Sequence, residues 1–126
     1  MNRLSAEVRE HIKAVAIRFL ERPYSKEFNC KHFVQAVYKE VGIPYPPLRK
    51  NLTVEQLENP PVGYVLFLAH KDPRIRRGRR STHVAIVFSE EKCIHNSGFF
   101  GNQVVITPFV ELFELYDLAI PGEQVI

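Results

Sequence analysis

Tryptophan is absent from the sequence, methionine occurs once, and cysteine occurs only twice, at Cys30 and Cys93. Two cysteines cannot build the disulfide framework of a small secreted scaffold, and this pair lacks the close spacing of a zinc-binding motif. No apolar run approaches the roughly 20 residues that a membrane-spanning helix needs. We therefore expect a soluble protein from a reducing compartment, without a disulfide, a metal or a cofactor.

The first 20 residues also lack the features of a secretory leader. Arg, Glu, His and Lys side chains interrupt the apolar residues, so the unbroken apolar segment of a signal peptide is missing. We expect a cytoplasmic location for the chain as given, unless a leader has been removed. A phage-associated protein and an effector exported by a dedicated machine stay open as alternatives.

The chain has 126 residues, of which 45% are hydrophobic and 25% are charged. This size suits one hydrophobic core, so we expect a single domain over residues 1–126. The net charge is only +3, and the arginines concentrate in the segment Arg74–Arg80. Guanidinium groups pair well with phosphate. This loop could therefore bind an anionic group or nucleic acid, although a solvated loop is the commoner explanation of such a run.

Two helices are predicted in the first third of the chain. Apolar residues at helical spacing after a Ser5 N-cap indicate a helix that ends near Arg22, because Pro23 cannot continue it. A second apolar stripe starts at Cys30 and ends before Gly42, which is typical of a left-handed C-cap. The second helix therefore begins at or beside Cys30.

A series of short, β-branched runs follows and predicts an antiparallel sheet of about five strands. The expected strands are residues 64–68, 83–88, 93–96, 104–107 and 115–120, with a helical turn from Pro108 before the last of them. Thr53 and Gln56 resemble a capping box that opens a short helical turn before the first strand. Helices followed by antiparallel strands define an α+β domain.

Cys30 is the candidate nucleophile. It lies at the expected N-terminus of the second helix, where unpaired N–H groups and the helix dipole favour a thiolate. It also belongs to the apolar stripe of that helix, which we expect to face the sheet and the partners of the thiol. A small buried hydrophobic residue is the alternative role for such a cysteine.

His83 and His95 are the candidate partners of this thiol. They fall on successive expected strands, and adjacent antiparallel strands can place two side chains opposite each other on one face. One imidazole can then accept the thiol proton while the other orients it. We expect His83 to be the base and His95 the orienting residue, although a histidine taken alone is more often structural.

The order Cys30, His83, His95 and the segments around these residues resemble the NlpC family of papain-like cell-wall peptidases. The segments are FNCKHFVQAVYKEVGIPYP, PPVGYVLFL, STHVAIVF and CIHNSG. The resemblance covers about Tyr24 to Phe109. It implies a papain-like (NlpC-type) domain in which a Cys-His-His triad hydrolyses peptide bonds, with peptidoglycan stem peptides as the substrate.

The motif around the nucleophile departs from the family pattern. The family has Asp-Cys-Ser where this chain has Asn29, Cys30 and Lys31, and its acidic and hydroxyl pair helps bind the free amine of the stem peptide. The resemblance also implies that Tyr24 stands for an upstream tyrosine of the family. We expect Tyr24, Asn29 and Lys31 to bind a peptide or muropeptide substrate, with a carboxylate or phosphate near the cleaved bond.

The string NCKHFV is also similar to the cysteine motif of lecithin:retinol acyltransferase relatives, whose papain-like fold is permuted. In those proteins the histidines precede the cysteine. Here they follow it, so the NlpC order fits better. Acyl transfer, or hydrolysis of a thioester or a lipid, stays open because an acyl-enzyme can pass its acyl group to water or to another acceptor.

His32 and Cys93 receive no catalytic role. His32 is expected to point away from the thiol around its helix. Cys93 is expected to be an inert buried thiol on the strand face of His95, and a bridge from it to Cys30 would block catalysis. A zinc site made of both cysteines and two histidines is not favoured, because the sequence offers no close ligand pair.

Overall fold

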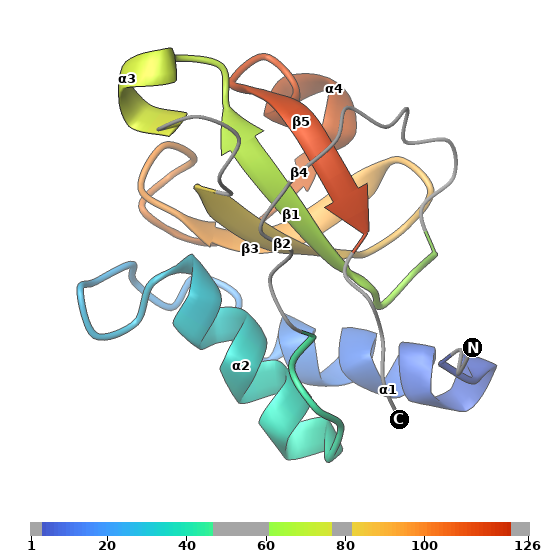
Figure 1. Ribbon diagram of the computed structural model, residues 1–126. Coiled ribbons are helices and arrows are strands. Elements are labelled where there is room, and N and C mark those ends of the chain that lie inside the picture. Colours follow the sequence, from blue (N-terminus) through green and yellow to red (C-terminus); the bar gives the residue numbers. More distant parts are fainter. Residues whose placement is uncertain (1–3, 47–60, 77–81, 122–126) are drawn as a thin grey trace.

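The computed structural model describes residues 4–46, 61–76 and 82–121 (Figure 1). Its elements are α1 (Ala6–Ile17), α2 (Cys30–Val41), β1 (Val65–His70), α3 (Pro73–Arg76), β2 (His83–Val87), β3 (Lys92–Ser97), β4 (Gln103–Pro108), α4 (Phe109–Leu112) and β5 (Tyr116–Pro121). The strands form one antiparallel sheet of five strands in the order β4-β3-β2-β1-β5. The predicted α+β class, with helices first and an antiparallel sheet after them, is confirmed. Within the described ranges, no helix combines the length and the apolar character needed to cross a membrane.

The first helix, α1, begins as predicted but ends early. The Ser5 hydroxyl caps it by accepting a hydrogen bond from an N–H group of the first turn. The prediction that the helix reaches Arg22 is wrong, because the α-helix ends at Ile17 and the next N–H groups bond to carbonyls three residues back. The chain then runs along the edge strand β4, where Pro23 forms a bridge with Gln103.

The second helix, α2, begins at Cys30 and stops before Gly42, as predicted. Asn29 is its N-cap, since its side-chain oxygen accepts hydrogen bonds from the backbone N–H groups of Lys31 and His32. Gly42 has φ +88°, the left-handed conformation that ends a helix most easily with glycine. The apolar stripe of α2 is buried and consists of Phe33, Val34, Val37 and Tyr38.

The strands lie where they were predicted, with small shifts at their ends. For example, β1 continues to His70 instead of ending at Leu68. The helical turn after Pro108 and the final strand are also found, as α4 and β5. The short helix α3 within the arginine-rich segment was not predicted. The capping box predicted at Thr53 and Gln56 lies outside the described residues.

The sheet buries side chains on both faces. One face packs against α1 and α2, which lie together on one side of the sheet in Figure 1, and it contributes Val65, Phe67, Val84, Ile86, Ile94 and Val104. The other face packs against α4 and contributes Leu66, Leu68, Ala85, Val87, Cys93 and Tyr116. Because side chains alternate along a strand, His83 and His95 belong to this second face, away from the long helices.

Candidate active site

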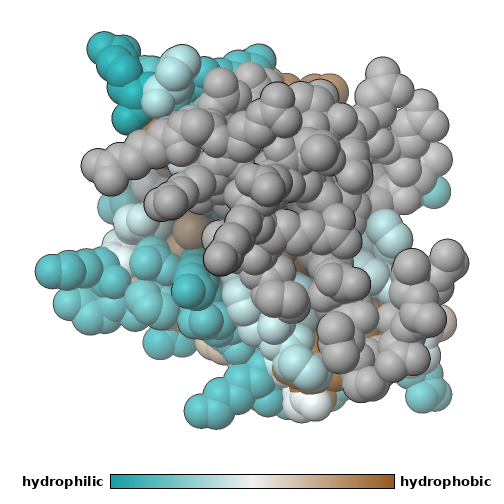
Figure 2. Space-filling view, in the orientation of Figure 1, coloured by the Kyte–Doolittle hydropathy of each residue, from teal (hydrophilic) through white to brown (hydrophobic). Residues whose placement is uncertain are grey.

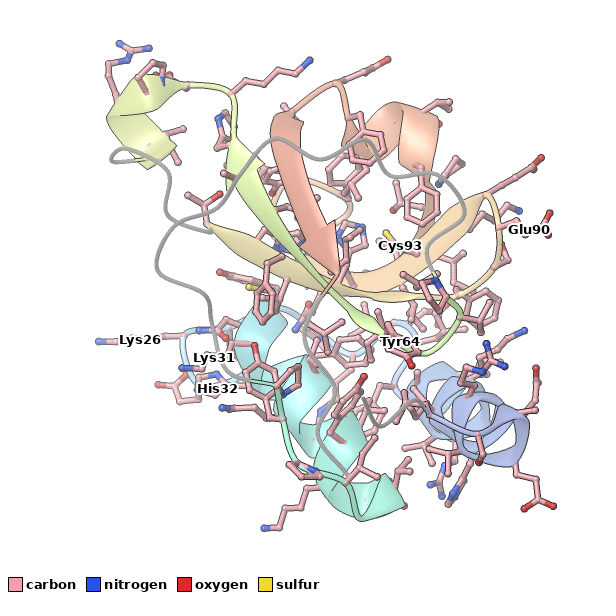
Figure 3. The ribbon with its side chains drawn as sticks, turned by 45° about the vertical axis from the view of Figure 1, so that its right-hand side comes forward. Lys26, Lys31, His32, Tyr64, Glu90 and Cys93 are labelled. Atoms are coloured by element: carbon pink, nitrogen blue, oxygen red, sulfur yellow. The ribbon has the colours of Figure 1, made fainter. Side chains whose placement is uncertain are left out.

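Cys30 occupies the first position of α2. A capping box formed by Asn29 and His32 holds the backbone around it. The Asn29 side chain accepts two N–H groups of the first turn, and the backbone N–H of Asn29 donates to Nδ1 of His32 at 3.2 Å. His32 is exposed and acts as a cap on the outside of the helix. The prediction that it does not face the thiol is consistent with this contact. Figure 3 shows Lys31 and His32 at this end of α2.

The charge state of the thiol is decided by opposing influences. Burial raises the pKa of Cys30, and the N–H groups of Val84, Lys31 and Cys30 itself, together with the Lys31 ammonium, lower it only in part. The N–H groups of the helix terminus act in the expected direction, but burial outweighs them. The resting group is a thiol, and it needs a base to become a nucleophile.

The sulfur of Cys30 contacts β2, the strand that carries His83, beyond the last residues of β2 that pair with β3. The paired residues of β2 and β3 are Ile86 with Ile94 and Val87 with Cys93. Beyond Ile86, the backbone N–H of Val84 bonds to the Cys30 sulfur. On the facing strand, the side-chain amide of Asn96 donates to the carbonyl of Phe28 at 2.8 Å. The segment before α2 therefore fills the place where the strands separate.

The two histidines do not lie on the sheet face that α2 covers. Strand alternation turns Val84 toward the helix, which places His83 on the opposite face. The Cys30 sulfur bonds to the backbone N–H of Val84, the residue that follows His83, so the thiol lies at the start of β2.

His83 and His95 are in direct contact, and the contact continues to a third side chain. Nε2 of His83 lies 2.6 Å from Nδ1 of His95, and Nε2 of His95 lies 2.8 Å from Oγ1 of Thr107. All three side chains are buried. Tyr116 stacks on the His83 ring with centroids 5.3 Å apart and planes 13° apart. We call this row of three residues, His83, His95 and Thr107, the relay.

The two imidazoles share a face, as predicted, but they are not directly opposite. Continuing the register of Ile86 with Ile94 would place Ala85 opposite His95, so His83 is its diagonal neighbour. Burial and the neighbouring His95 lower the pKa of His83 well below its ordinary value, and burial lowers that of His95 to about 4. Both rings are therefore neutral at neutral pH, and each carries one proton to place in the relay.

Solved structures with this arrangement of helices and strands provide a comparison. NlpC1 from Trichomonas vaginalis has a TM-score of 0.70 at 16% identity, over 94% of this chain and 45% of that one. An NlpC/P60 family protein from Bacillus cereus has a TM-score of 0.67 at 25% identity, over 88% of this chain and 39% of that one. The fold is of the NlpC/P60 type.

A third NlpC/P60-type structure agrees. A lipoprotein-like NLP/P60 family protein from Staphylococcus aureus has a TM-score of 0.67 at 18% identity, over 99% of this chain and 44% of that one. The chain thus spans less than half the length of each of these proteins. No protein-family model matches the sequence, and no curated protein matches it. The predicted papain-like, NlpC-type domain is confirmed at the level of the fold.

The three predicted substrate-binding residues differ in how they are placed. Tyr24 is half-buried, and the proximity of Cys30 adds to burial in raising its pKa. Lys31 is exposed and follows Cys30 directly. Hydrophilic residues predominate on the side of the molecule where the segment before α2 lies (Figure 2). Asn29 already uses its side-chain oxygen in the helix cap. Its main role in the structure is therefore to hold the first turn of α2.

Cys93 is buried, as expected, and the arginine-rich segment is described only in part. Cys93 is buried within the sheet, where burial raises its pKa to about 12 (Figure 3). Within the described ranges, no group of three histidine, cysteine or acidic side chains is arranged to hold a metal ion. In the arginine-rich segment, Arg74 is paired with Asp72 through contacts of 3.1 and 2.9 Å. Residues 77–80 of that segment lie outside the described residues.

The sequence did not single out four side chains that surround the predicted site. Thr107 ends the relay, Tyr116 stacks on His83, Asn96 holds the segment before α2, and Tyr45 has its pKa raised to about 12 by burial and by Cys30. The alternation of the strand that contains Thr107 was visible in the sequence. The sequence did not show which residue of the neighbouring strand lies opposite Thr107, because that depends on the register between β3 and β4.

Proposed function

We propose that the protein is a cysteine hydrolase that cleaves an amide bond through an acyl-enzyme on Cys30. The observation that carries this proposal is the buried contact of His83 with His95 beside the backbone that bonds the Cys30 sulfur. An NlpC/P60-type fold supports the same class of chemistry. Cys30, His83 and His95 are the residues assigned to the reaction.

His83 serves as the base. Its Nε2 faces His95, so its Nδ1 exchanges the proton with the thiol. Because burial keeps Cys30 protonated and His83 neutral, the proton moves to Nδ1 as the sulfur attacks the carbonyl carbon of the substrate. The backbone N–H of Cys30 contributes to the oxyanion hole.

The acyl-enzyme forms and breaks in two balanced steps. The new S–C bond forms as the C–N bond breaks, and the imidazolium of His83 gives its proton to the leaving amine. Water then attacks the thioester while His83 takes a proton from it; the C–O bond forms, the S–C bond breaks, and His83 returns the proton to the Cys30 sulfur. His95 holds the His83 ring and its tautomer through both steps.

The substrate class that we propose is a peptidoglycan stem peptide or a related peptide. The NlpC/P60-type fold supports the peptide, and the exposed cation of Lys31 beside the thiol favours a carboxylate near the cleaved bond. Cys30 contributes to raising the pKa of Tyr24 and of Tyr45, so both phenols lie near the thiol, where a substrate would contact them.

The test is incubation with defined muropeptides and a panel of unrelated peptides, followed by mass spectrometry of the products. Wild type and Cys93→Ala, the matched control, should release cleaved amide products, whereas Cys30→Ala should release none. An added amine acceptor reports acyl transfer, because its mass then appears on the product in place of water. Cleavage by Cys30→Ala at the wild-type rate, or none by wild type on any amide substrate, would overturn the proposal.

A further inference from the structure

We propose that Thr107 is a positioning residue that sets the direction of hydrogen bonding through His95 to His83. This inference rests on the proposed function, because it concerns the base of the Cys30 reaction. Thr107 lies on β4, with only 3% of its surface exposed, and its Oγ1 is 2.8 Å from Nε2 of His95. Nothing in the sequence pattern of the nucleophile or of the histidines points to it.

The relay can be protonated in two directions. In one, His83 donates its Nε2–H to Nδ1 of His95, and His95 donates its Nε2–H to the Thr107 hydroxyl oxygen. In the other, the Thr107 hydroxyl donates to Nε2 of His95, and His95 donates its Nδ1–H to Nε2 of His83. The contacts of 2.6 and 2.8 Å fit both directions, because a hydroxyl both donates and accepts.

Only the first direction leaves His83 competent as a base. A neutral imidazole carries one N–H, so a proton on Nε2 leaves the lone pair on Nδ1. In the second direction Nδ1 already carries the proton and cannot accept that of the thiol. The orientation of the relay therefore decides whether Cys30 can be activated.

The protonated form of His83 requires the same direction of hydrogen bonding. After His83 has taken the thiol proton, both of its nitrogens carry hydrogen, so Nδ1 of His95 must accept. His95 is neutral, since burial lowers its pKa to about 4, and its single proton must then sit on Nε2. That N–H is fully buried, and the Thr107 oxygen is the acceptor beside it.

A threonine is suited to this position for two reasons. Its β-branched side chain fits a strand, and its hydroxyl can rotate to accept from His95. Valine has almost the same shape and can neither donate nor accept. Thr107→Val therefore isolates the hydrogen bond, and Thr107→Ser restores the hydroxyl without the methyl group.

The experiment reads the tautomers directly and needs no substrate. Ring nitrogen shifts from NMR of ¹⁵N-labelled protein at pH 7 to 8 should show His83 and His95 of the wild type both as Nε2–H tautomers. Thr107→Val should shift both toward Nδ1–H, and Thr107→Ser should restore the wild-type pattern. On a cleaved substrate, kcat of Thr107→Val should fall about 10- to 100-fold with KM nearly unchanged, and Thr107→Ser should recover most of it.

The outcomes separate this inference from the hydrolase proposal. A wild-type His83 with its proton on Nδ1 would overturn the role of Thr107, and so would Thr107→Val with wild-type tautomers and kcat. The wild-type spectrum gives this answer even where a variant fails to fold. If wild type cleaves no amide substrate while Thr107→Val reverses the tautomers, the relay stands and the hydrolase proposal fails.

Discussion

Nε2 of His83 lies 2.6 Å from Nδ1 of His95, on two strands whose paired residues end before either histidine is reached. The imidazole contact thus connects the strands beyond the point where Ile86 pairs with Ile94. It also commits Nε2 of His83 to His95. This contact underlies the predicted ranking of the histidines and the predicted pH dependence.

The first prediction concerns the two thiols. Iodoacetamide at pH 7 should alkylate Cys30 at least about tenfold faster than Cys93, because Cys30 is partly exposed and Cys93 is fully buried with a pKa of about 12. Peptide mass spectrometry over a time course measures both rates in one sample. In denaturant the two rates should converge. Equal rates in the folded protein would contradict the assignment of Cys30 as nucleophile.

The second prediction ranks the histidines. His83→Ala should be nearly inactive because His83 moves the proton, whereas His95→Asn and His95→Gln should retain partial activity because they keep a polar group beside His83. The measurement is kcat on a substrate that Cys30→Ala cannot process. A double Cys30→Ala, His83→Ala variant should be little worse than Cys30→Ala alone, since groups that act as one unit are not additive.

Circular dichroism provides the control for this ranking, because His83 and His95 are both buried and their loss could open the sheet. A folded His83→Ala variant with near-wild-type turnover would identify another residue as the base. It would leave the buried histidine pair as a structural contact.

Much of the fold could be predicted from local signals. Ser5 and Gly42 marked helix boundaries through capping chemistry, and period-two apolar runs located the strands. The end of α1 was misplaced because Pro23 forbids a continuing helix but does not say how early the helix stops. That end is set by pairing of the next residues with β4, which is a contact distant in sequence.

The sequence identified the candidate residues of the site, but it predicted less of how they are arranged in space. Cys30, His83 and His95 follow from their places on a helix terminus and on neighbouring strands. Which sheet face carries the histidines depends on which face the helices cover, and which residues lie opposite them depends on the register; alternation alone reveals neither. The pKa of Cys30 depends on a balance of burial against N–H groups, and burial appears only when the chain has folded.

The third prediction is a loss of stability on acidification. The pKa values of His83 and His95 are lowered in the folded protein, so the unfolded chain binds protons more readily between about pH 6.5 and pH 4. Their contribution is fully present above the unfolded pKa and is lost as pH falls. Each buried histidine should reduce the free energy of unfolding by about 1.4 kcal/mol per pH unit in this window.

Urea denaturation between pH 5 and pH 7 measures this slope. In His95→Gln, about one proton fewer should be taken up on unfolding, so the slope of the free energy of unfolding against pH should be smaller. His11→Gln, an exposed substitution on α1, is the matched control. A slope that His95→Gln leaves unchanged, or a protein more stable at pH 5 than at pH 7, would refute the prediction.

The fourth prediction tests substrate charge. Lys31→Glu should raise KM about 3- to 10-fold for a substrate with a carboxylate near the cleaved bond, because it replaces an attractive charge beside the thiol by a repulsive one. The effect should weaken at high salt. Lys26→Glu, on the segment before α2, makes the same charge change as a control and should change KM less. An unchanged KM in Lys31→Glu, or a preference for a cationic amine, would show that Lys31 does not select the substrate.

The last prediction concerns Asn96, whose amide donates to the Phe28 carbonyl at 2.8 Å and so holds the segment that leads into Cys30. Asn96 is fully buried, and its Oδ1 has no hydrogen-bond partner among the described residues. Asn96→Leu should cost about 1 kcal/mol of stability, because it removes the donor to Phe28 and at the same time removes the unpaired oxygen. Its effect on kcat should exceed that on KM, since the thiol loses its anchor.

Asn96→Asp tests the hydrogen-bond donor alone, because it removes the side-chain N–H groups and keeps the shape of the side chain. A buried carboxylate cannot donate to the Phe28 carbonyl, so at pH 7 this variant should be less stable than Asn96→Leu. Burial raises the pKa of such a carboxyl, and its protonated form can donate to the carbonyl. The stability deficit of Asn96→Asp relative to wild type should therefore shrink between pH 7 and pH 5 in urea denaturation, while that of Asn96→Leu stays constant. A deficit that is equal for both variants at both pH values would show that the Asn96 donor does not hold the segment before α2.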